Sequence, residues 1–221
     1  MDKPRAQYHP VKNKRQFRNA LLEWFQENAK SYPWRETTDP WPILVSEIML
    51  QQTTVASVIT NHRFEKFLQE FPNIETISVA PEEKILRAWE GLGYYNRVRN
   101  LQKAAQTILQ NHEGKFPSDA ETLETLPGVG RYTAGAVGSF AFNHPAPIVD
   151  GNIARVLSRL LDYHEEVDST EGQKVIWKTA RELLAPSKAR LFNSALMDLG
   201  QTMCSSKSPA CLICPARSFC Q

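Results

Sequence analysis

The stretch Leu126-Pro127-Gly128-Val129-Gly130 decides the fold, because it lies between two segments that both have the pattern of helices. Ser118 and Glu121 form a capping box that predicts the start of a helix over 118–125. After the turn, a second helical pattern runs over 131–142. Two helices joined by such a glycine-containing turn form a helix–hairpin–helix.

The turn has the properties of an anion site. Because glycine has no Cβ, Gly128 and Gly130 allow the backbone N–H groups of the turn, including that of Val129, to approach an anion closely. The N-terminus of the following helix adds partial positive charge. We therefore expect the turn to bind a DNA phosphate without reading the base sequence. The alternative, an ordinary connector between two helices, stays open for the turn taken alone.

Most other segments also show the spacing of amphipathic helices. Apolar residues recur at intervals of three and four within 17–25, 98–108 and 156–161, and such stripes face a core. Further helices are expected over 42–52, 55–70, 82–90, 171–185 and 189–203. No run alternates as a strand does, so we expect an all-α protein.

The overall charge says little about partners. The formal net charge is +2 over 221 residues, too small to diagnose a nucleic-acid partner. Basic residues gather in two clusters, each of which taken alone is best explained as a solvated face: Lys3, Arg5, Lys12, Lys14, Arg15 and Arg18, and then Arg97, Arg99 and Lys103. No signal peptide and no stretch of membrane-spanning length occur, so we expect a cytoplasmic protein without a membrane partner.

All four cysteines lie near the end of the sequence, at Cys204, Cys211, Cys214 and Cys220. Four thiolates within one loop can close around an iron–sulfur cluster without ligands from the rest of the fold. We expect a structural cluster there. Zinc is the second choice, because only Cys211 and Cys214 form the short pair that structural zinc sites repeat. Disulfides would require an oxidising compartment.

Two acidic residues stand in unusual surroundings. Asp150 in Ile148-Val149-Asp150-Gly151-Asn152 precedes a helical pattern whose unpaired N–H groups favour an ionised carboxylate, although an ordinary N-cap is the better explanation for this segment taken alone. Glu47 is surrounded by apolar residues in 43–50, so we expect desolvation to raise its pKa and to allow a protonated form near neutral pH. A solvent-facing position on an amphipathic helix is the alternative for Glu47.

The hairpin turn, the aspartate that follows it and the cysteine loop together resemble the endonuclease III superfamily of DNA glycosylases over almost the whole chain. Four shorter motifs resemble specifically the MutY branch of adenine glycosylases: Pro33-Trp34-Arg35, Ser46-Glu47-Ile48-Met49-Leu50-Gln51-Gln52-Thr53, Gly91-Leu92-Gly93-Tyr94-Tyr95 and Val149-Asp150-Gly151-Asn152. Typical members continue past the cysteine loop into a domain that inspects 8-oxoguanine, so this sequence is expected to represent the catalytic region.

The resemblance implies a particular architecture. A six-helix barrel over 30–142 would contain the hairpin, and a second helical domain, made of 1–29 and 143–221, would carry one 4Fe-4S cluster in its loop 204–220. The active site would lie between the domains. The implied partner is double-stranded DNA with a mismatched or damaged base pair, bound by a monomer associated with the nucleoid.

The resemblance also implies roles in breaking an N-glycosidic bond, which leaves an electron-rich base and a cationic sugar. Glu47 would protonate the adenine, and Asp150 would stabilise the sugar cation with support from Asn152. Tyr132 stands where bifunctional relatives carry a Schiff-base lysine, and a phenol cannot form that imine. We therefore expect a monofunctional glycosylase.

Further positions match residues that contact DNA in the family. A flipped base leaves a gap that must be filled, and Gln52 and Tyr94 match the wedging residues, with Gln51 and Thr53 beside them. The residues that match the adenine pocket are Trp34, Arg35 and Leu50. For Trp34 and Tyr94 taken singly, core packing is the competing explanation.

One departure from the family pattern leaves the substrate open. Ser194 stands where adenine glycosylases commonly place Gln or Glu against the adenine edge, and its side chain forms fewer hydrogen bonds. Compact relatives excise thymine or uracil from T:G or U:G pairs, which makes such an enzyme the alternative. A third hypothesis is a catalytically idle DNA-binding or redox-sensing module, against which the joint presence of Glu47, Asp150 and Tyr132 argues.

Overall fold

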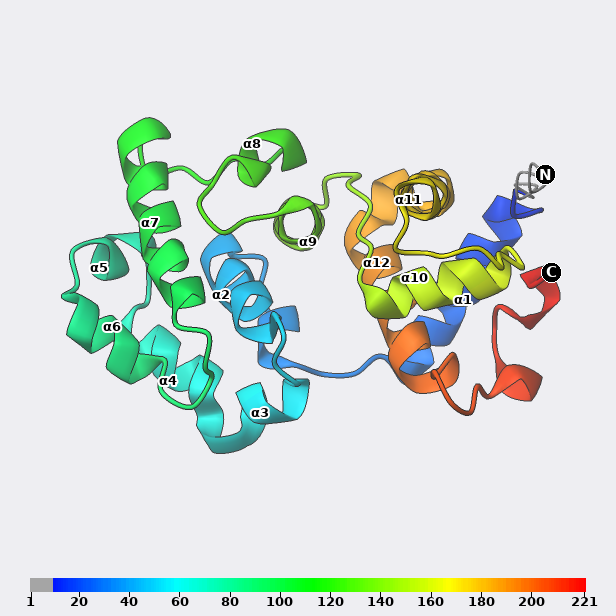
Figure 1. Cartoon of the computed structure of the whole chain (residues 1–221), viewed down its shortest axis with the longest axis horizontal. Coiled ribbons are helices and arrows are strands. Elements are labelled where there is room, and N and C mark those ends of the chain that lie inside the picture. Colours follow the sequence, from blue (N-terminus) through cyan, green and yellow to red (C-terminus); the bar gives the residue numbers. More distant parts are fainter. Residues whose placement is uncertain (1–9) are drawn as a thin grey trace. The chain divides into compact units, whose positions relative to one another are not determined.

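The computed structural model describes residues 10–221, and this part of the chain is helical with no strand (Figure 1). The all-α prediction is confirmed. Residues 1–9, with Lys3 and Arg5 of the first basic cluster and the start of the predicted second domain, lie outside the described residues. Within 10–221, no helix combines the length and the apolar character that a membrane crossing requires.

The helices form two compact units. The unit Ser31–His144, here called the hairpin unit, contains η1 (Pro33–Arg35), α2 (Pro40–Leu50), α3 (Val55–Ile59), η2 (Thr60–His62), α4 (Arg63–Glu70), α5 (Ile74–Ser78), α6 (Glu82–Ala88), α7 (Asn96–Asn111), α8 (Ala120–Glu124) and α9 (Arg131–Phe142). The other, here called the cysteine unit, joins the chain up to Lys30 to Pro145–Gln221 and contains α1 (Lys14–Asn28), α10 (Gly151–Leu160), α11 (Thr170–Leu183), η3 (Pro186–Lys188), α12 (Ala189–Asp198), a π-helical turn (Leu199–Met203), η5 (Cys211–Ile213) and η6 (Arg217–Phe219).

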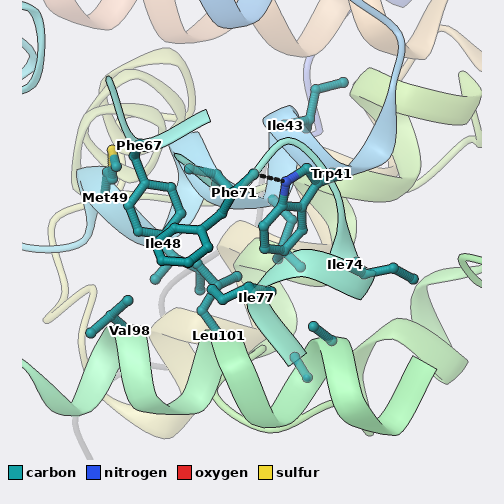
Figure 2. Close-up of a cluster of buried hydrophobic side chains, with 14 of the residues drawn as sticks. Trp41, Ile43, Ile48, Met49, Phe67, Phe71, Ile74, Ile77, Val98 and Leu101 are labelled. Atoms are coloured by element: carbon teal, nitrogen blue, oxygen red, sulfur yellow. Dashed lines mark hydrogen bonds between the residues drawn. The ribbon is translucent and has the colours of Figure 1, made fainter. Parts of the chain in front are cut away.

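The hairpin unit has a core of aromatic and aliphatic side chains from α2, α4, α5 and α7 (Figure 2). Trp41 and Phe67 are 2% and 1% exposed, and Phe71 is fully buried. The indole N–H of Trp41 donates to the Phe71 carbonyl at 2.9 Å, so the ring is buried without an unsatisfied polar atom. Helix α2 packs against both α7 and α9, which holds it inside the unit.

Helix α2 begins at Pro40, where a missing N–H costs nothing and the fixed φ of proline suits the first turn. Asp39 caps it by accepting the Trp41 N–H at 2.9 Å. All residues from Ile43 to Met49 are buried. The helix therefore has apolar surroundings on every side, as expected for a helix inside a core.

The prediction of a single helix over 55–70 is wrong. The chain forms α3, the short turn η2 and α4, because Asn61 and His62 have left-handed φ angles of 65° and 54° that no α-helix can contain. Val58 before the break and Phe64 after it are both buried, at 0% and 3% exposure. Burial of both side chains explains why tertiary packing overrides the continuous helical pattern.

The prediction that Ser118 caps the helix before the hairpin is also wrong. Asp119 is the N-cap of α8, and its carboxylate accepts the Thr122 N–H at 2.7 Å. Ser and Asp cap helices about equally well, so local preference does not choose between them. A start at Ala120 places Leu123 in a fully buried position of the helix.

In the cysteine unit, α1 packs against α11 and α12. The Lys14 ammonium pairs with Glu182 at 2.6 Å, and Arg18 donates to the carbonyl oxygens of Leu183 at 2.7 Å and Glu182 at 2.9 Å, which caps the end of α11. The predicted helix over 189–203 divides into α12 and the π-helical turn. That turn leads the chain directly to Cys204.

Candidate functional site

Glu47 lies in the buried part of α2 and is 4% exposed. The solvent-facing alternative is therefore wrong for this residue. Ile43 and Ile48, on the same helix, are 1% and 2% exposed. The Glu47 carboxyl group is therefore held inside the hairpin unit, away from bulk water.

The structure brings the helix of Glu47 next to the helix of Tyr132. Helices α2 and α9 pack together, and the Gln51 side-chain amide donates to the Thr133 hydroxyl at 3.4 Å. Gln51 follows Glu47 by one helical turn and so shares its side of α2. Tyr132, adjacent to Thr133, is half-buried on the first turn of α9.

The two hairpin glycines differ in what they require. Gly128 has a φ of +77°, and a Cβ there would lie 2.6 Å from the Cβ of Asn100. Gly130 is the N-cap of α9 with an ordinary φ of −94°, and a Cβ there would have no neighbour within 4 Å. Val129 between them is buried. The fold thus explains the glycine at 128, whereas the glycine at 130 presents an exposed backbone that no internal contact accounts for.

Gln51, Gln52 and Tyr94, all predicted to contact DNA, line one pocket of about 760 Å³ in the hairpin unit. The other lining residues are Tyr95, Asn96, Arg97 and Arg99. Tyr94 is 65% exposed, so core packing does not explain it. Thr53 lies beside the pocket residues and receives a hydrogen bond from Arg97 at 3.1 Å.

The predicted adenine-pocket residues Trp34, Arg35 and Leu50 belong to the same unit. Trp34 is 8% exposed, stacks on Tyr32 at 5.2 Å between ring centroids and meets the Phe64 ring edge at 5.5 Å. Its packing explains the tryptophan without a ligand. The Arg35 guanidinium lies 4.9 Å from the centroid of the Tyr32 ring, and Leu50 is partly buried against the core.

Asp150 is the N-cap of α10 in the cysteine unit. One carboxylate oxygen accepts the Ile153 N–H at 2.7 Å, and the other accepts the Asn152 side-chain N–H at 2.9 Å. Asp150 therefore acts as an ordinary N-cap and, by the same hydrogen bonds, is an oriented carboxylate. Both oxygens accept a hydrogen bond, which holds the carboxylate in one orientation.

Asn152 is held in place by Arg155 and lies against Gly200. The Arg155 guanidinium donates to the Asn152 side-chain oxygen at 2.9 Å, to the Gly200 carbonyl at 2.7 Å and to the Cys204 carbonyl at 2.9 Å. A Cβ on Gly200 would lie 2.9 Å from the Asn152 Cβ. The start of α10 and the π-helical turn are therefore in tight contact beside Asp150.

Ser194 lies on the same unit's α12 and is 7% exposed. Its neighbour Asn193 donates from its side chain to the Ala146 carbonyl at 2.9 Å, which ties α12 to the segment before Asp150. Asn193 and Ser194 are thus two adjacent buried polar residues of α12.

The four cysteines are free thiols on a loop anchored at several points. Arg159 donates to the Cys204 sulfur at 3.4 Å and to the Ser205 carbonyl at 2.7 Å. Near the other end, Ala216 is buried and the Phe219 ring packs edge-on against Phe17 of α1 at 5.6 Å. These contacts fix the loop to α1 and α10.

The thiols influence one another. Burial raises the pKa of Cys220 to about 11, and the charges of Cys214, Cys204 and Cys211 add to this effect. The pKa of Cys214 is raised by burial and by Cys204 and Cys211. Thiolates that oppose each other's ionisation fit a shared cationic group, as a metal cluster provides. Within 10–221, no three His, Cys, Asp or Glu side chains converge as ligands of a single metal ion.

Three arginines support these sites, and sequence reasoning did not assign them a role. Arg97 was grouped with a basic face, and Arg155 and Arg159 were not singled out at all. Their hydrogen bonds go to backbone carbonyls far away in sequence, for example from Arg97 to Ile48 and from Arg155 to Cys204. The only signal in the sequence is the placement of Arg155 and Arg159 one turn apart on a helix whose other face is apolar.

A family model described as HhH-GPD superfamily base excision DNA repair protein matches residues 45–183. The adenine DNA glycosylase of Homo sapiens is 39% identical over 214 residues, which cover 93% of this chain and 39% of the human protein. The adenine DNA glycosylase of Buchnera aphidicola subsp. Baizongia pistaciae is 41% identical and is covered to 58%. The chain thus spans roughly half the length of such curated relatives or less.

Solved structures agree on the fold. A thermostable thymine-DNA glycosylase superposes with a TM-score of 0.85 at 30% identity, covering 94% of this chain and 95% of that one. Endonuclease III in a trapped covalent DNA intermediate superposes with a TM-score of 0.76 at 27% identity, with 95% and 96% of the two chains covered. The helical arrangement is therefore that of DNA glycosylases of this type.

Proposed function

Since the chain belongs to the HhH-GPD superfamily of base excision DNA repair proteins, we propose that it is a DNA glycosylase that hydrolyses the N-glycosidic bond of adenine mispaired with 8-oxoguanine or guanine. The observation that carries the choice of adenine is the identity of 39% and 41% to adenine DNA glycosylases over 93% of this chain. The enzyme acts as a monomer on double-stranded DNA, in the nucleoid.

Glu47 supplies the proton to the departing base. Cleavage of an N-glycosidic bond puts negative charge on the base, and a general acid that protonates it lowers the barrier. The 4% exposure of Glu47 supports this role, because bulk water is kept away from a proton donor at such a position. After the base has left, the resulting carboxylate can accept a proton from the attacking water.

Asp150 stabilises the positive charge that develops on the sugar. The hydrogen bonds from the Ile153 N–H and the Asn152 amide support this role, because they hold an acceptor-only carboxylate in a fixed orientation. A preorganised anion needs no reorganisation when the sugar cation forms. Asn152 is a positioning residue in this scheme.

Base release is not followed by strand cleavage through an imine. Such a lyase step needs an amine nucleophile, and Tyr132 offers a phenol on the first turn of α9. Tyr132, like Asn152, supports Asp150 instead. The product is an abasic site with both DNA strands intact.

The DNA is held by its phosphates and its distorted base pair. The backbone of Gly128, Val129 and Gly130 binds a phosphate, which the exposed glycine at 130 supports. Gln52 and Tyr94 fill the space that the flipped base leaves. The pocket that both residues line supports this role. The residues that complete the contacts to the bases are Gln51, Thr53, Trp34, Arg35, Leu50 and Ser194.

Cys204, Cys211, Cys214 and Cys220 hold one 4Fe-4S cluster. The cysteine spacing and the contacts that fix both ends of the loop, from Arg159 to Cys204 and from Phe219 to Phe17, support this assignment. When bound, the cluster supplies the cross-link that orders the loop 204–220 and takes no part in the hydrolysis. Arg159, which donates to the Cys204 sulfur, orients that ligand.

The test is a set of duplexes that carry A:8-oxoguanine, A:G, T:G or U:G, scored for abasic sites after alkali. Cleavage of the adenine strand in the first two duplexes is the expected result. Cleavage at T:G alone would change the assigned target base to thymine. Thymine is the second candidate because a thermostable thymine-DNA glycosylase is 30% identical to this chain. Cleavage of none, with retained DNA binding, would leave a binding module.

A further inference from the structure

Arg97 forms the densest set of hydrogen bonds in the hairpin unit's pocket. Its guanidinium lies at the start of α7 and reaches two separate turns of the chain. At the end of α2 it donates to the carbonyl oxygens of Ile48 and Met49, both at 3.0 Å, to that of Gln51, and to the Thr53 hydroxyl at 3.1 Å. Before α7 it donates to the carbonyls of Leu92 at 2.8 Å and Gly93 at 3.2 Å.

The two turns share an uncommon backbone feature. Gln52 has a φ of 56° and Tyr94 a φ of 47°, both in the left-handed region that residues with a Cβ rarely occupy. Such conformations persist only where the surroundings impose them, and they gather at functional positions. Both side chains are exposed and line the same pocket.

Arg97 binds the peptide group that precedes each left-handed residue. The carbonyl of Gln51 belongs to the peptide plane that rotates with the φ of Gln52, and the carbonyl of Gly93 belongs to the plane that rotates with the φ of Tyr94. A guanidinium that holds both carbonyls therefore restrains the peptide plane on the N-terminal side of each left-handed residue. One side chain thus sets the direction in which two exposed side chains leave the backbone.

The surroundings of Arg97 exclude a direct role as a phosphate ligand. Its terminal nitrogens already donate to protein acceptors, and its guanidinium lies 5.5 Å from the ring centroids of both Trp89 and Tyr94. Burial lowers its pKa from the ordinary arginine value, as expected for a group withdrawn from water. The residue is therefore half-buried and bonded to the protein, and the prediction of a solvated basic face is wrong for it.

We propose that Arg97 is a positioning residue that preorganises Gln52 and Tyr94 as a pair for insertion into DNA. This inference rests on the proposed function, because insertion presupposes a duplex with a flipped base. Preorganisation matters because the two turns would otherwise relax to common backbone conformations and would have to be reordered at each binding event. Lysine cannot replace this arginine, since one ammonium with three donors cannot span two turns.

The test compares Arg97→Lys with Arg18→Lys as a matched control. Arg18 also donates to two backbone carbonyls, but at the end of α11 in the cysteine unit. In the free protein, amide hydrogen exchange over 50–54 and 91–96 should rise together by about tenfold in Arg97→Lys, since more than one charge-assisted hydrogen bond is lost. Arg18→Lys should leave both segments unchanged.

DNA binding provides the second readout. Arg97→Lys should weaken binding to an A:8-oxoguanine duplex with a non-cleavable adenine analogue by about tenfold, while binding to a fully paired duplex changes by less than about twofold. With 2-aminopurine as the target base, the fluorescence increase on flipping should fall in parallel. The control variant should bind and flip as the unmodified protein does.

A double-mutant cycle separates positioning from general support of the fold. In a Gln52→Ala, Tyr94→Ala background, Arg97→Lys should cost almost nothing further in mismatch affinity, because the side chains it positions are gone. A penalty that adds in full, or unchanged exchange in the two turns, would overturn the inference. Failure of the unmodified protein to prefer the mismatch would count against the proposed function, whereas the exchange result still decides the role of Arg97.

Discussion

At the scale of single residues, two carboxyl groups in different surroundings carry the proposed chemistry. Glu47 is 4% exposed within α2, and Asp150 accepts two hydrogen bonds at the start of α10. Glu47 has little access to water, whereas the orientation of the Asp150 carboxylate is fixed by its two hydrogen bonds. The different tasks of the two residues follow from these surroundings.

Replacing either carboxyl should stop base release without unfolding the protein. Glu47→Gln should lower the single-turnover rate by about 10²–10⁴-fold, the usual contribution of a general acid. Asp150→Asn should lower it at least as much, and α10 should stay capped because asparagine is an equally good N-cap. Unfolding midpoints and DNA affinity serve as controls. Rapid turnover in a well-folded Asp150→Asn protein would remove the aspartate from its role.

The two hairpin glycines give a matched pair. Gly128→Ala should destabilise the protein by roughly 1–3 kcal/mol, because φ is +77° and the new Cβ would meet Asn100. Gly130→Ala should cost less than about 1 kcal/mol, because its backbone is ordinary and the space is open. Its DNA affinity should nevertheless fall, as measured by fluorescence anisotropy at fixed salt. Affinity unchanged in Gly130→Ala would exclude the hairpin backbone as a phosphate site.

At the scale of elements, the packing of one turn against another decides where Asp150 points. The π-helical turn brings Gly200 against Asn152, whose backbone carbonyl would lie 3.2 Å from a Cβ at position 200. Because Asn152 donates to Asp150, a displacement at this contact reaches the carboxylate directly. The glycine is thus needed for a close approach of two elements.

Gly200→Ala should therefore act on catalysis more than on folding. A shift of about 1 Å at a catalytic group costs roughly 100-fold in rate, and we expect a loss of that order in the single-turnover rate. The unfolding midpoint should fall as well, because the new Cβ would meet backbone atoms of Asn152 at 3.2 Å, whereas the mismatch affinity should change far less than the rate. A variant that folds and turns over normally would mean that α10 and the π-helical turn move apart without consequence for Asp150.

At the scale of the whole molecule, the cysteine loop joins distant parts of the sequence within its unit. Phe219 packs on Phe17 of α1, and Arg155 and Arg159 of α10 donate to the carbonyl of Cys204. Order in the loop therefore supports the helix that carries Asp150. A cluster held by the four cysteines would add covalent cross-links to these contacts.

The purified protein should be brown and should contain about four irons per chain. Cys211→Ser should reduce the visible absorption and lower the unfolding midpoint, because the loop loses one of its ligands. Metal analysis distinguishes the two metals, since a colourless protein with one zinc per chain would replace the cluster by the zinc alternative.

Much of the fold could be predicted because it depends on short-range patterns. The helix over 131–142 begins and ends where its pattern indicates, at Arg131 and Phe142. The break at Asn61 and His62 could not be predicted, since the sequence there continues a helical pattern and only the burial of Val58 and Phe64 selects the break. Among site residues, the cysteine spacing and the N-cap position of Asp150 are visible in the sequence, whereas the hydrogen bonds of Arg97 are not.

The sequence by itself determined the helical class, the glycine-containing turn between two helices and the cysteine loop, because each depends on residues within a few positions of one another. Only the tertiary structure decided that Glu47 is buried, that Gly200 touches Asn152 and that Arg97 joins two left-handed turns. These features depend on segments that meet only when the chain folds. Packing and hydrogen-bond partners that lie far apart in the sequence leave no local pattern, so only the folded structure reveals them.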